Sequence, residues 1–324
     1  MEKVITDLIK DYIRSSSLYK SFVKNPLSTF HMKGLEGYPL TRLAEIVQRK
    51  SSGRIIFLTP TDEIAREAYQ DFSDITDIPV IYFPSSGKKL YSPSTASAAE
   101  YAQSRALGEI ENLKQGIIVT GLRAFASPVI SRSSLSSLSL ELRAGAPFRP
   151  MELAEKLSAA GYFRQGSCYE VGTYSIRGEV MEIFPFGEEN PVRIYASWDE
   201  IEKMAFYDPI TQKALKNLSR YSLSLMSQES ETESEPFTSY LKTSDYLFYV
   251  GSSRMEVSFR SLMNEAKALF KEAYQENPDA VLPDKLLSDP MAYASSKHAK
   301  MVAEDIHLIY IEGKATAKEL KSMF

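Results

Sequence analysis

Residues Arg54 to Phe72 read RIIFLTPTDEIAREAYQDF and carry the clearest secondary-structure signal in the sequence. Its first part, RIIFLTP, is a short continuous apolar run, typical of a strand that is buried on both faces of a parallel sheet. Thr61 and Asp62 can cap the helix that follows, which opens with acidic residues as the helix dipole prefers. The stretch therefore predicts one strand and one helix of an α/β fold.

The same alternation continues on both sides of this stretch. Helical periodicity marks TRLAEIVQRK at 41–50 and SAAEYAQSRALGEIENL at 97–113, and short apolar runs mark PVIYFP at 79–84 and GIIVTG at 116–121. Strands that alternate with helices predict a parallel sheet with helices on its faces. We therefore expect an α/β sandwich over residues 30–130.

The alternation resumes near the end of the chain. SDYLFYVG at 244–251 is again a strand of the buried type, and a long helix follows at 255–276. IHLIYIE at 306–312 predicts a last strand. This order indicates that the chain returns to the first sheet.

The pattern between these two parts is different. SRSSLSSLSL at 131–140 predicts a loop that runs into a strand, with Leu138, Leu140 and Leu142 alternating. A short helix is expected in PFRPMELAEKLSAAGY, with Gly161 just after its end. TYSIRGEVMEIFP and PVRIYASW alternate at period two, with turn residues Gly187 to Pro191 between them. These features predict a small α+β module inserted into the α/β domain.

Three segments follow from this organisation. Residues 1–143 would form the first part of the α/β domain, and residues 144–225 the inserted module. Residues 226–324 would hold an acidic linker, beginning MSQESETESEPF, and then the return to the α/β domain.

Composition excludes several classes of protein. The chain has 324 residues, 44% of them hydrophobic, and a net charge of −4, so bulk electrostatic binding of nucleic acid is disfavoured. One cysteine, Cys168, and three scattered histidines exclude a disulfide scaffold and give no zinc spacing. Apolar runs stay well short of the roughly 20 residues of a membrane span. We expect a cytoplasmic monomer without a bound metal.

Residues 34–41, GLEGYPLT, lie before the first helix of the sandwich and fit the P-loop pattern G-x-x-x-x-G-K-[ST] only in part. Gly34 and Thr41 fit the first glycine and the final hydroxyl. Pro39 and Leu40 stand where the second glycine and the lysine belong. The residues alone leave two interpretations open: a chance loop, or a nucleotide site that has lost its chemistry.

Several segments together resemble a known family. RIIFLTPTDEIAREAYQDF and FPSSGKKLYSPSTASAAEYAQSRALGEIENLKQGIIVTGLRAF resemble the UvrB-like N-terminal region of bacterial transcription-repair coupling factors. YEVGTYSIRGEVMEIFPFGEENPVRIYASWDEIEKMAFYDPITQ is similar to the module that binds UvrA in both coupling factors and UvrB. Its pattern, Y-x-x-R-G-x-x-x-[DE]-I-[FY]-P, then D-E-I-E and [FY]-D-P-x-[TS]-Q, is the most specific part of the likeness.

UvrB is the close competitor, and it carries a long tyrosine-rich hairpin after the strand that corresponds to PVIYFP. The connection from Phe83 to Ala98 is too short for that hairpin. UvrB also keeps an intact P-loop, whereas the UvrB-like region of the coupling factor has a degenerate one. The resemblance therefore favours the coupling factor.

The resemblance implies a degenerate RecA-like domain of the P-loop NTPase type. The missing lysine would have neutralised phosphates, and Pro39 removes a backbone N–H from the phosphate nest. Gly251 and Ser252 stand where the UvrB pattern has the acids that hold magnesium. The non-functional site would comprise these residues: Gly34, Gly37, Pro39, Leu40, Thr41, Gly251 and Ser252.

Two arginines are the candidates for partner binding. Val192, Ile194 and Ala196 share one face of their strand, so Arg193 points to the other, and Arg177 likewise opposes Ile176. Without the resemblance, both are most simply soluble surface. With it, they match the arginines by which the family's module grips UvrA. Ser197 occupies the position where the family often has an aromatic residue, so Trp198 either supplies that anchor through a bulge or faces the core.

Other candidates are weaker. Asp199 and Glu200 could suggest acid–base chemistry, but no partner histidine accompanies them. Tyr82, Tyr91 and Tyr101 could suggest base stacking, yet no basic run surrounds them, so packing is the simpler role.

The resemblance implies a function without catalysis in this chain. It would be an N-terminal fragment that recruits UvrA in transcription-coupled nucleotide excision repair. ATP, magnesium, DNA and RNA polymerase would be bound by other parts of a parent ATP-dependent DNA translocase. Two alternatives stay open: a UvrB-like excinuclease subunit with ATP-dependent DNA contact, and a stand-alone UvrA-binding adaptor.

Overall fold

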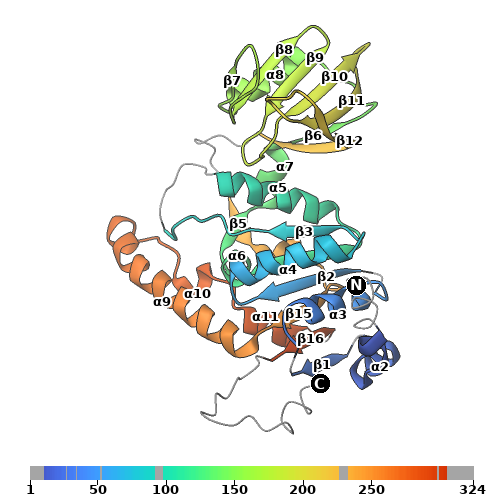
Figure 1. Ribbon diagram of the computed structural model, residues 1–324. Helices are drawn as coiled ribbons and strands as arrows, with labels where there is room; N and C mark the ends of the chain where they lie inside the picture. The colour runs from blue at the N-terminus through green and yellow to red at the C-terminus, as the bar shows by residue number, and fades with distance from the viewer. Residues whose placement is uncertain are drawn as a thin grey trace, which may run out of the picture.

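A computed structural model describes residues 11–26, 28–33, 35–51, 53–91, 98–225, 233–297 and 299–304. Within them the chain forms an α/β domain and a separate β-rich module that stands on one side of it (Figure 1). No helix in these ranges is long and apolar enough to cross a membrane.

The α/β domain is built on a six-stranded parallel sheet in the order β1-β16-β15-β2-β4-β3. The predicted parallel sheet is therefore confirmed, and RIIFLTP lies in its interior as β2, with every residue of the strand buried. The strands are β1 (Thr29–Met32), β2 (Arg54–Thr59), β3 (Val80–Phe83), β4 (Gly116–Gly121), β15 (Tyr246–Val250) and β16 (Lys300–Ala303).

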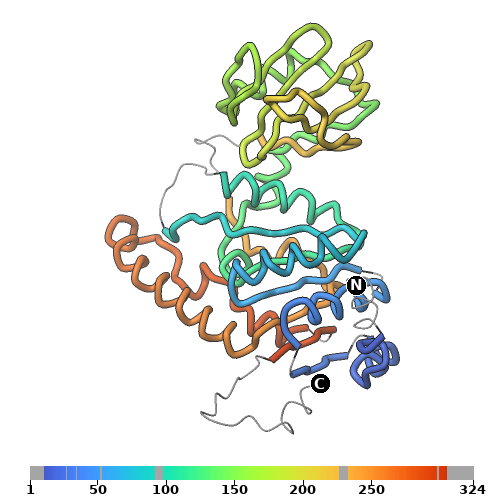
Figure 2. The backbone as a smooth tube through the Cα atoms, viewed as in Figure 1, coloured from blue at the N-terminus to red at the C-terminus, as the bar shows by residue number. Residues whose placement is uncertain are grey.

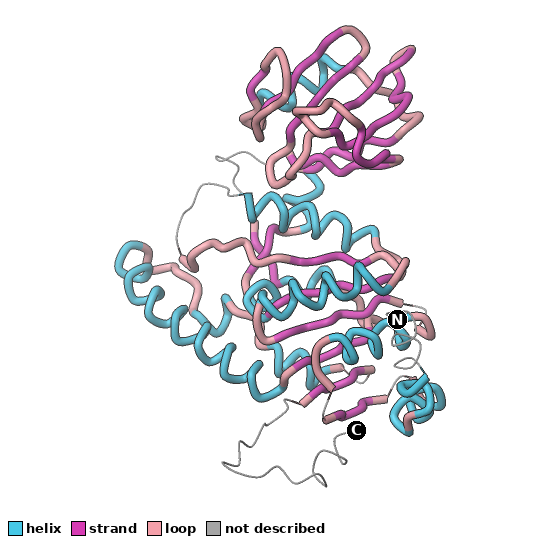
Figure 3. Tube along the Cα trace, viewed as in Figure 1, coloured by secondary structure: helices cyan, strands magenta, loops and turns pink. Residues whose placement is uncertain are grey.

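Helices cover both faces of this sheet and create two apolar cores (Figure 3). On one face, Leu40 and Leu43 of α3 (Tyr38–Gln48) and Phe72 of α4 (Asp62–Ile75) pack together. The predicted cap of α4 is confirmed, since the Thr61 hydroxyl accepts a hydrogen bond from the Ile64 N–H at 3.3 Å. The other core packs against α5 (Ala98–Asn112), α6 (Leu122–Ala126), α9 (Ser252–Glu276), α10 (Pro283–Leu286) and α11 (Pro290–Ser296).

The remaining short elements lie near the sheet edges. They are α2 (Ser17–Lys24), η1 (Phe237–Tyr240), and the two-stranded pair of β5 (Pro128–Ile130) with β14 (Ser234–Pro236). The strand next to β15 is β16, whereas the run predicted as the last strand, 306–312, lies outside the described residues.

The serine-rich segment corrects one prediction. Residues Arg132–Ser137 form a helix, α7, and not a loop. The Ser131 hydroxyl caps this helix by accepting a hydrogen bond from the Ser134 N–H at 3.2 Å. Leu135, within the helix, has a buried side chain. The predicted strand follows as β6 (Ser139–Arg143), which contains Leu140 and Leu142 but not Leu138.

The module is a six-stranded sheet backed by α8 (Pro150–Ala159), after which Gly161 takes a positive φ as predicted. Its segment TYSIRGEVMEIFP is not one strand but a hairpin that turns at Gly178. The sheet order is β12-β11-β10-β9-β8-β7. The strands are β7 (Phe163–Arg164), β8 (Thr173–Arg177), β9 (Val180–Phe184), β10 (Val192–Ser197), β11 (Glu200–Tyr207) and β12 (Ala214–Leu218).

Several contacts join the module to the α/β domain. The chain leaves through β6 and returns through β13 (Arg220–Ser224), and these strands pair antiparallel (Figure 2). The turn after β9 also reaches α5, where the rings of Phe186 and Tyr101 stack with their centroids 4.6 Å apart. Gly187 fits there because a Cβ would lie 3.0 Å from the backbone nitrogen of Ala102.

Candidate functional site

The first candidate site is the face of the module sheet that points away from α8. In β10, Val192, Ile194 and Ala196 are buried in the module core, so Arg193 lies on the opposite face. Strand β8, which lies two strands from β10 and pairs with β9, places Arg177 on that same face, opposite Ile176. The structure thus brings together two arginines that are 16 residues apart in the sequence.

A buried carboxylate links these arginines. Glu182 of β9 has a side chain only 6% exposed, and its Oε1 accepts from Nε of Arg193 at 2.8 Å. Its Oε2 accepts from the Ser175 hydroxyl at 3.1 Å and lies 3.4 Å from a guanidinium nitrogen of Arg177. Sequence reasoning missed Glu182 as a site residue, although it alternates with Met181 and Ile183 and fills the acidic position of the quoted pattern.

The two arginines differ in their freedom. Arg177 is 60% exposed, whereas Arg193 is 16% exposed and lies over the ring of Tyr207, with 4.0 Å between guanidinium carbon and ring centroid. Burial raises the pKa of the Tyr207 hydroxyl, so the phenol stays neutral beneath the arginine. Arg193 is therefore held in place, whereas Arg177 uses one guanidinium nitrogen for the Ser167 hydroxyl, at 3.0 Å, and for Glu182, and leaves its other donors exposed.

Trp198 lies in the two-residue turn between β10 and β11. It is 96% exposed, so the interpretation that it faces the core is wrong. Trp198 and Asp199 both take positive φ, 52° and 62°, which is uncommon for a bulky residue. A register shift between Tyr195 and Ala196 precedes the turn, and Ser197 before it is partly exposed.

The second candidate is the P-loop-like segment, of which Gly34 lies outside the described residues. Gly37 has a φ of 58° and caps α3, with Pro39 in the first turn, where its missing N–H costs least. Leu40 is 1% exposed and packs in the core. The Thr41 hydroxyl donates to the Tyr38 carbonyl at 2.9 Å and lies 3.3 Å from Oδ2 of Asp71.

The strand-end residues Gly251 and Ser252 lie close to this segment. Gly251 caps α9 in a left-handed conformation, and its N–H donates to the Ala303 carbonyl at 2.9 Å. One turn into α9, Arg254 pairs with Glu36 of the loop before α3. The loop before α3 and the start of α9 are thus joined by an ion pair at the carboxyl ends of the strands.

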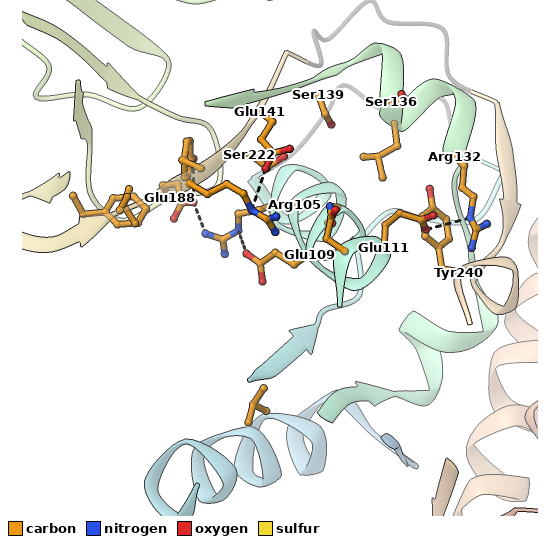
Figure 4. Close-up of a pocket in the computed structure, with 18 of the residues that line it drawn as sticks. Arg105, Glu109, Glu111, Arg132, Ser136, Ser139, Glu141, Glu188, Ser222 and Tyr240 are labelled. Atoms are coloured by element: carbon orange, nitrogen blue, oxygen red, sulfur yellow. Dashed lines mark hydrogen bonds and ion pairs between the residues drawn. The ribbon is translucent and has the colours of Figure 1, made fainter. Parts of the chain in front are cut away.

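A cleft of about 850 Å³ lies between α5 and the strands β6, β12 and β13 (Figure 4). No local sequence pattern predicts this cleft, because the residues that line it come from both the α/β domain and the module. Its charges pair within it: Arg220 with Glu141 at 3.1 Å, Arg132 with Glu111 at 3.3 Å, and Arg105 with Glu188. A polar lining of this kind is typical of an interface between two domains of one chain.

Comparisons with known proteins agree with the module's location. Residues 140–228 match the family model described as the UvrB interaction domain. The transcription-repair-coupling factor of Borreliella burgdorferi is 24% identical over 216 residues, which is 65% of this chain and 19% of that protein. The Escherichia coli protein of the same name is 25% identical over 185 residues, 56% of this chain and 16% of its own length.

UvrB proteins are similar as well. The UvrABC system protein B of Kosmotoga olearia is 27% identical over 195 residues, 55% of this chain and 29% of that protein. This chain therefore spans less than a third of the length of each of these three relatives. Residues 140–228 thus match the UvrB interaction domain, and the chain as a whole is similar to bacterial transcription-repair coupling factors and to UvrB.

Proposed function

We propose that this chain recruits UvrA to sites of nucleotide excision repair through the β8–β10 face of its module. The observation that carries the proposal is the Glu182-centred network, which holds Arg177 outward from a UvrB interaction domain. An arginine presents up to five N–H donors in a planar fork, which suits carboxylates on a partner surface. Its 60% exposure leaves most of those donors free to reach such a surface.

Trp198 is the second element of the proposed interface. An indole ring that is almost fully exposed, on a strained turn, contributes little to the fold. Tryptophan and arginine are the residue types enriched among interface hot spots. Trp198 would therefore supply the apolar contact that Ser197, at the family's aromatic position, cannot.

We propose in addition that the α/β domain is a degenerate RecA-like domain that neither binds nor hydrolyses ATP. Three features support this: the buried Leu40, the Thr41 hydroxyl bonded within its own helix, and the Glu36–Arg254 pair across the strand ends. A phosphate would have to displace these internal contacts without a lysine to receive it. Translocation on DNA and binding of RNA polymerase would then belong to other regions of a coupling factor.

Calorimetric titration with purified UvrA tests the proposal. Arg177→Ala should weaken binding about 30-fold, or roughly 2 kcal/mol, while the free energy of unfolding changes by less than about 0.5 kcal/mol. Arg260→Ala is the matched control, because Arg260 is 68% exposed on α9 of the α/β domain and pairs with Glu256 one turn away in the same helix. Equal affinity of both variants and the parent chain would refute the assignment.

A further inference from the structure

The turn between β11 and β12 presents a second exposed apolar side chain beside Arg193. Residues Asp208 to Gln212 read DPITQ, and Ile210 at their centre is 86% exposed. Trp198 lies before β11 and Ile210 lies after it, so the two mark opposite ends of that strand.

The turn is held by hydrogen bonds on its inner side. The Asp208 carboxylate accepts from the N–H groups of Ile210 and Thr211, each at 2.8 Å. The backbone N–H of Gln212 donates to the Asp208 carbonyl at 2.8 Å. The Thr211 and Ile210 amides also keep the pKa of the Asp208 carboxyl below its usual range, so the carboxylate stays charged.

Arg193, on the neighbouring strand β10, donates hydrogen bonds to the last residue of this turn. Gln212 has a φ of 61°, a conformation that residues other than glycine adopt rarely and at some cost. Its side-chain amide donates to the Pro209 carbonyl at 2.6 Å. Its backbone carbonyl and side-chain oxygen both accept from the guanidinium of Arg193. The strained residue is thus fixed by Arg193.

We infer that Arg193 is a positioning residue, and that the contact it presents to UvrA is Ile210. This inference rests on the proposed function and assigns roles within that interface. The donors of Arg193 are already engaged by Glu182 and Gln212, and its planar face lies on Tyr207, so little of it is free for a partner. Ile210 by contrast is free on nearly all sides.

The arrangement specifies the chemistry of the partner surface. Arg177, and Lys203, whose amine lies 4.3 Å from the Tyr195 ring centroid, place positive charge on this face between its apolar ends, whereas the charged Asp208 lies in the Ile210 turn itself. The complementary surface on UvrA would therefore combine an apolar socket for Ile210 with carboxylates nearby. Burying an isoleucine on binding is expected to strengthen affinity by about tenfold or more.

Affinity for UvrA, measured by calorimetry, tests the contact. Ile210→Ser should weaken binding about tenfold, whereas Val257→Ser, on the exposed face of α9, should leave it unchanged. An Ile210→Ser chain that binds as tightly as the parent would overturn the contact. If Arg177→Ala still loses binding in that case, the proposed function stands and only this inference fails; if neither variant loses affinity, both fail.

A double-mutant cycle tests the positioning role of Arg193. Arg193→Lys keeps the charge but loses the fork that holds Gln212. If Arg193 acts through the turn, Ile210→Ser should cost little further affinity in the Arg193→Lys chain. The amide hydrogens of Ile210 and Thr211 should also exchange faster in that chain. If the affinity losses of the two substitutions multiply, or if exchange at these two amides is unchanged, Arg193 does not act through the turn and the inference is overturned.

Discussion

Two regions use polar residues in opposite ways: the carboxyl ends of the parallel strands near Gly37, and the module face around Glu182. At the strand ends, Thr41 bonds to Tyr38 and Asp71, and Glu36 pairs with Arg254. At the module face, the buried Glu182 anchors Arg193 and leaves Arg177 outside. The first set of contacts uses the polar side chains within the protein, whereas the second leaves an arginine exposed to solvent. A hydrogen-bond network alone therefore does not identify a binding site. What distinguishes them is the exposed side chains that the network leaves.

The largest expected effect comes from placing a lysine at position 40, where the P-loop pattern has one. Leu40→Lys would place a charge in the apolar core of α3, and we expect it to destabilise the chain by roughly 4 kcal/mol. Val257→Lys, the same kind of change at a position 64% exposed, should stay within about 0.5 kcal/mol. Denaturant unfolding measures both. If Leu40→Lys is well tolerated, position 40 has room for a phosphate-binding side chain. The contrast between the two regions would then be wrong.

An intermediate effect is expected at the module face. Glu182→Gln removes the buried charge that fixes Arg193 and Arg177, and should lower the free energy of unfolding by about 2 kcal/mol and weaken UvrA binding. Glu141→Gln is the control, because that carboxylate pairs with Arg143 and Arg220 at a more exposed position, where ion pairs contribute little. A loss of stability with full affinity would indicate that the network supports the fold alone.

The smallest expected effect separates stability from binding at Trp198. Trp198→Gly relieves a positive φ and should stabilise the module by a few tenths of a kcal/mol, to about 1 kcal/mol at most. Its affinity for UvrA should nevertheless fall. Asp199→Gly relieves the neighbouring φ of 62° in the same turn and should keep full affinity. If the two variants bind UvrA equally well, the indole is not part of the interface.

The α/β elements were predictable because each carries its own local signal. The continuous apolar run of β2 and the Thr61 cap of α4 specify strand and helix without reference to distant residues. Residues 132–137 were harder, since their serines resemble a loop until Ser131 is recognised as a cap and Leu135 as a buried residue. In TYSIRGEVMEIFP the apolar positions change from even numbers (Tyr174, Ile176) to odd numbers (Met181, Ile183), and this change of phase at Gly178 is easily missed in so short a segment.

The sequence predicts the face of the module sheet on which the arginines lie, but not the hydrogen bonds that hold each of them. Period-two alternation places Arg193 and Arg177 on one face, but it does not say that one is clamped and the other free. That difference depends on Glu182 in a neighbouring strand and on Gln212 in a turn 19 residues beyond Arg193. The cleft beside α5 was beyond prediction for the same reason, because it forms only when two distant segments meet.

Hydrogen–deuterium exchange over the whole chain, with Mg-ATP and separately with UvrA, measures the proposed binding of UvrA and the proposed loss of nucleotide binding in one experiment. UvrA should slow exchange along β8–β10 and the Asp208–Gln212 turn. Mg-ATP should leave exchange unchanged at residues 35–41 and at the start of α9. Slower exchange at these two segments with Mg-ATP, or unchanged exchange along the module face with UvrA, would contradict these expectations.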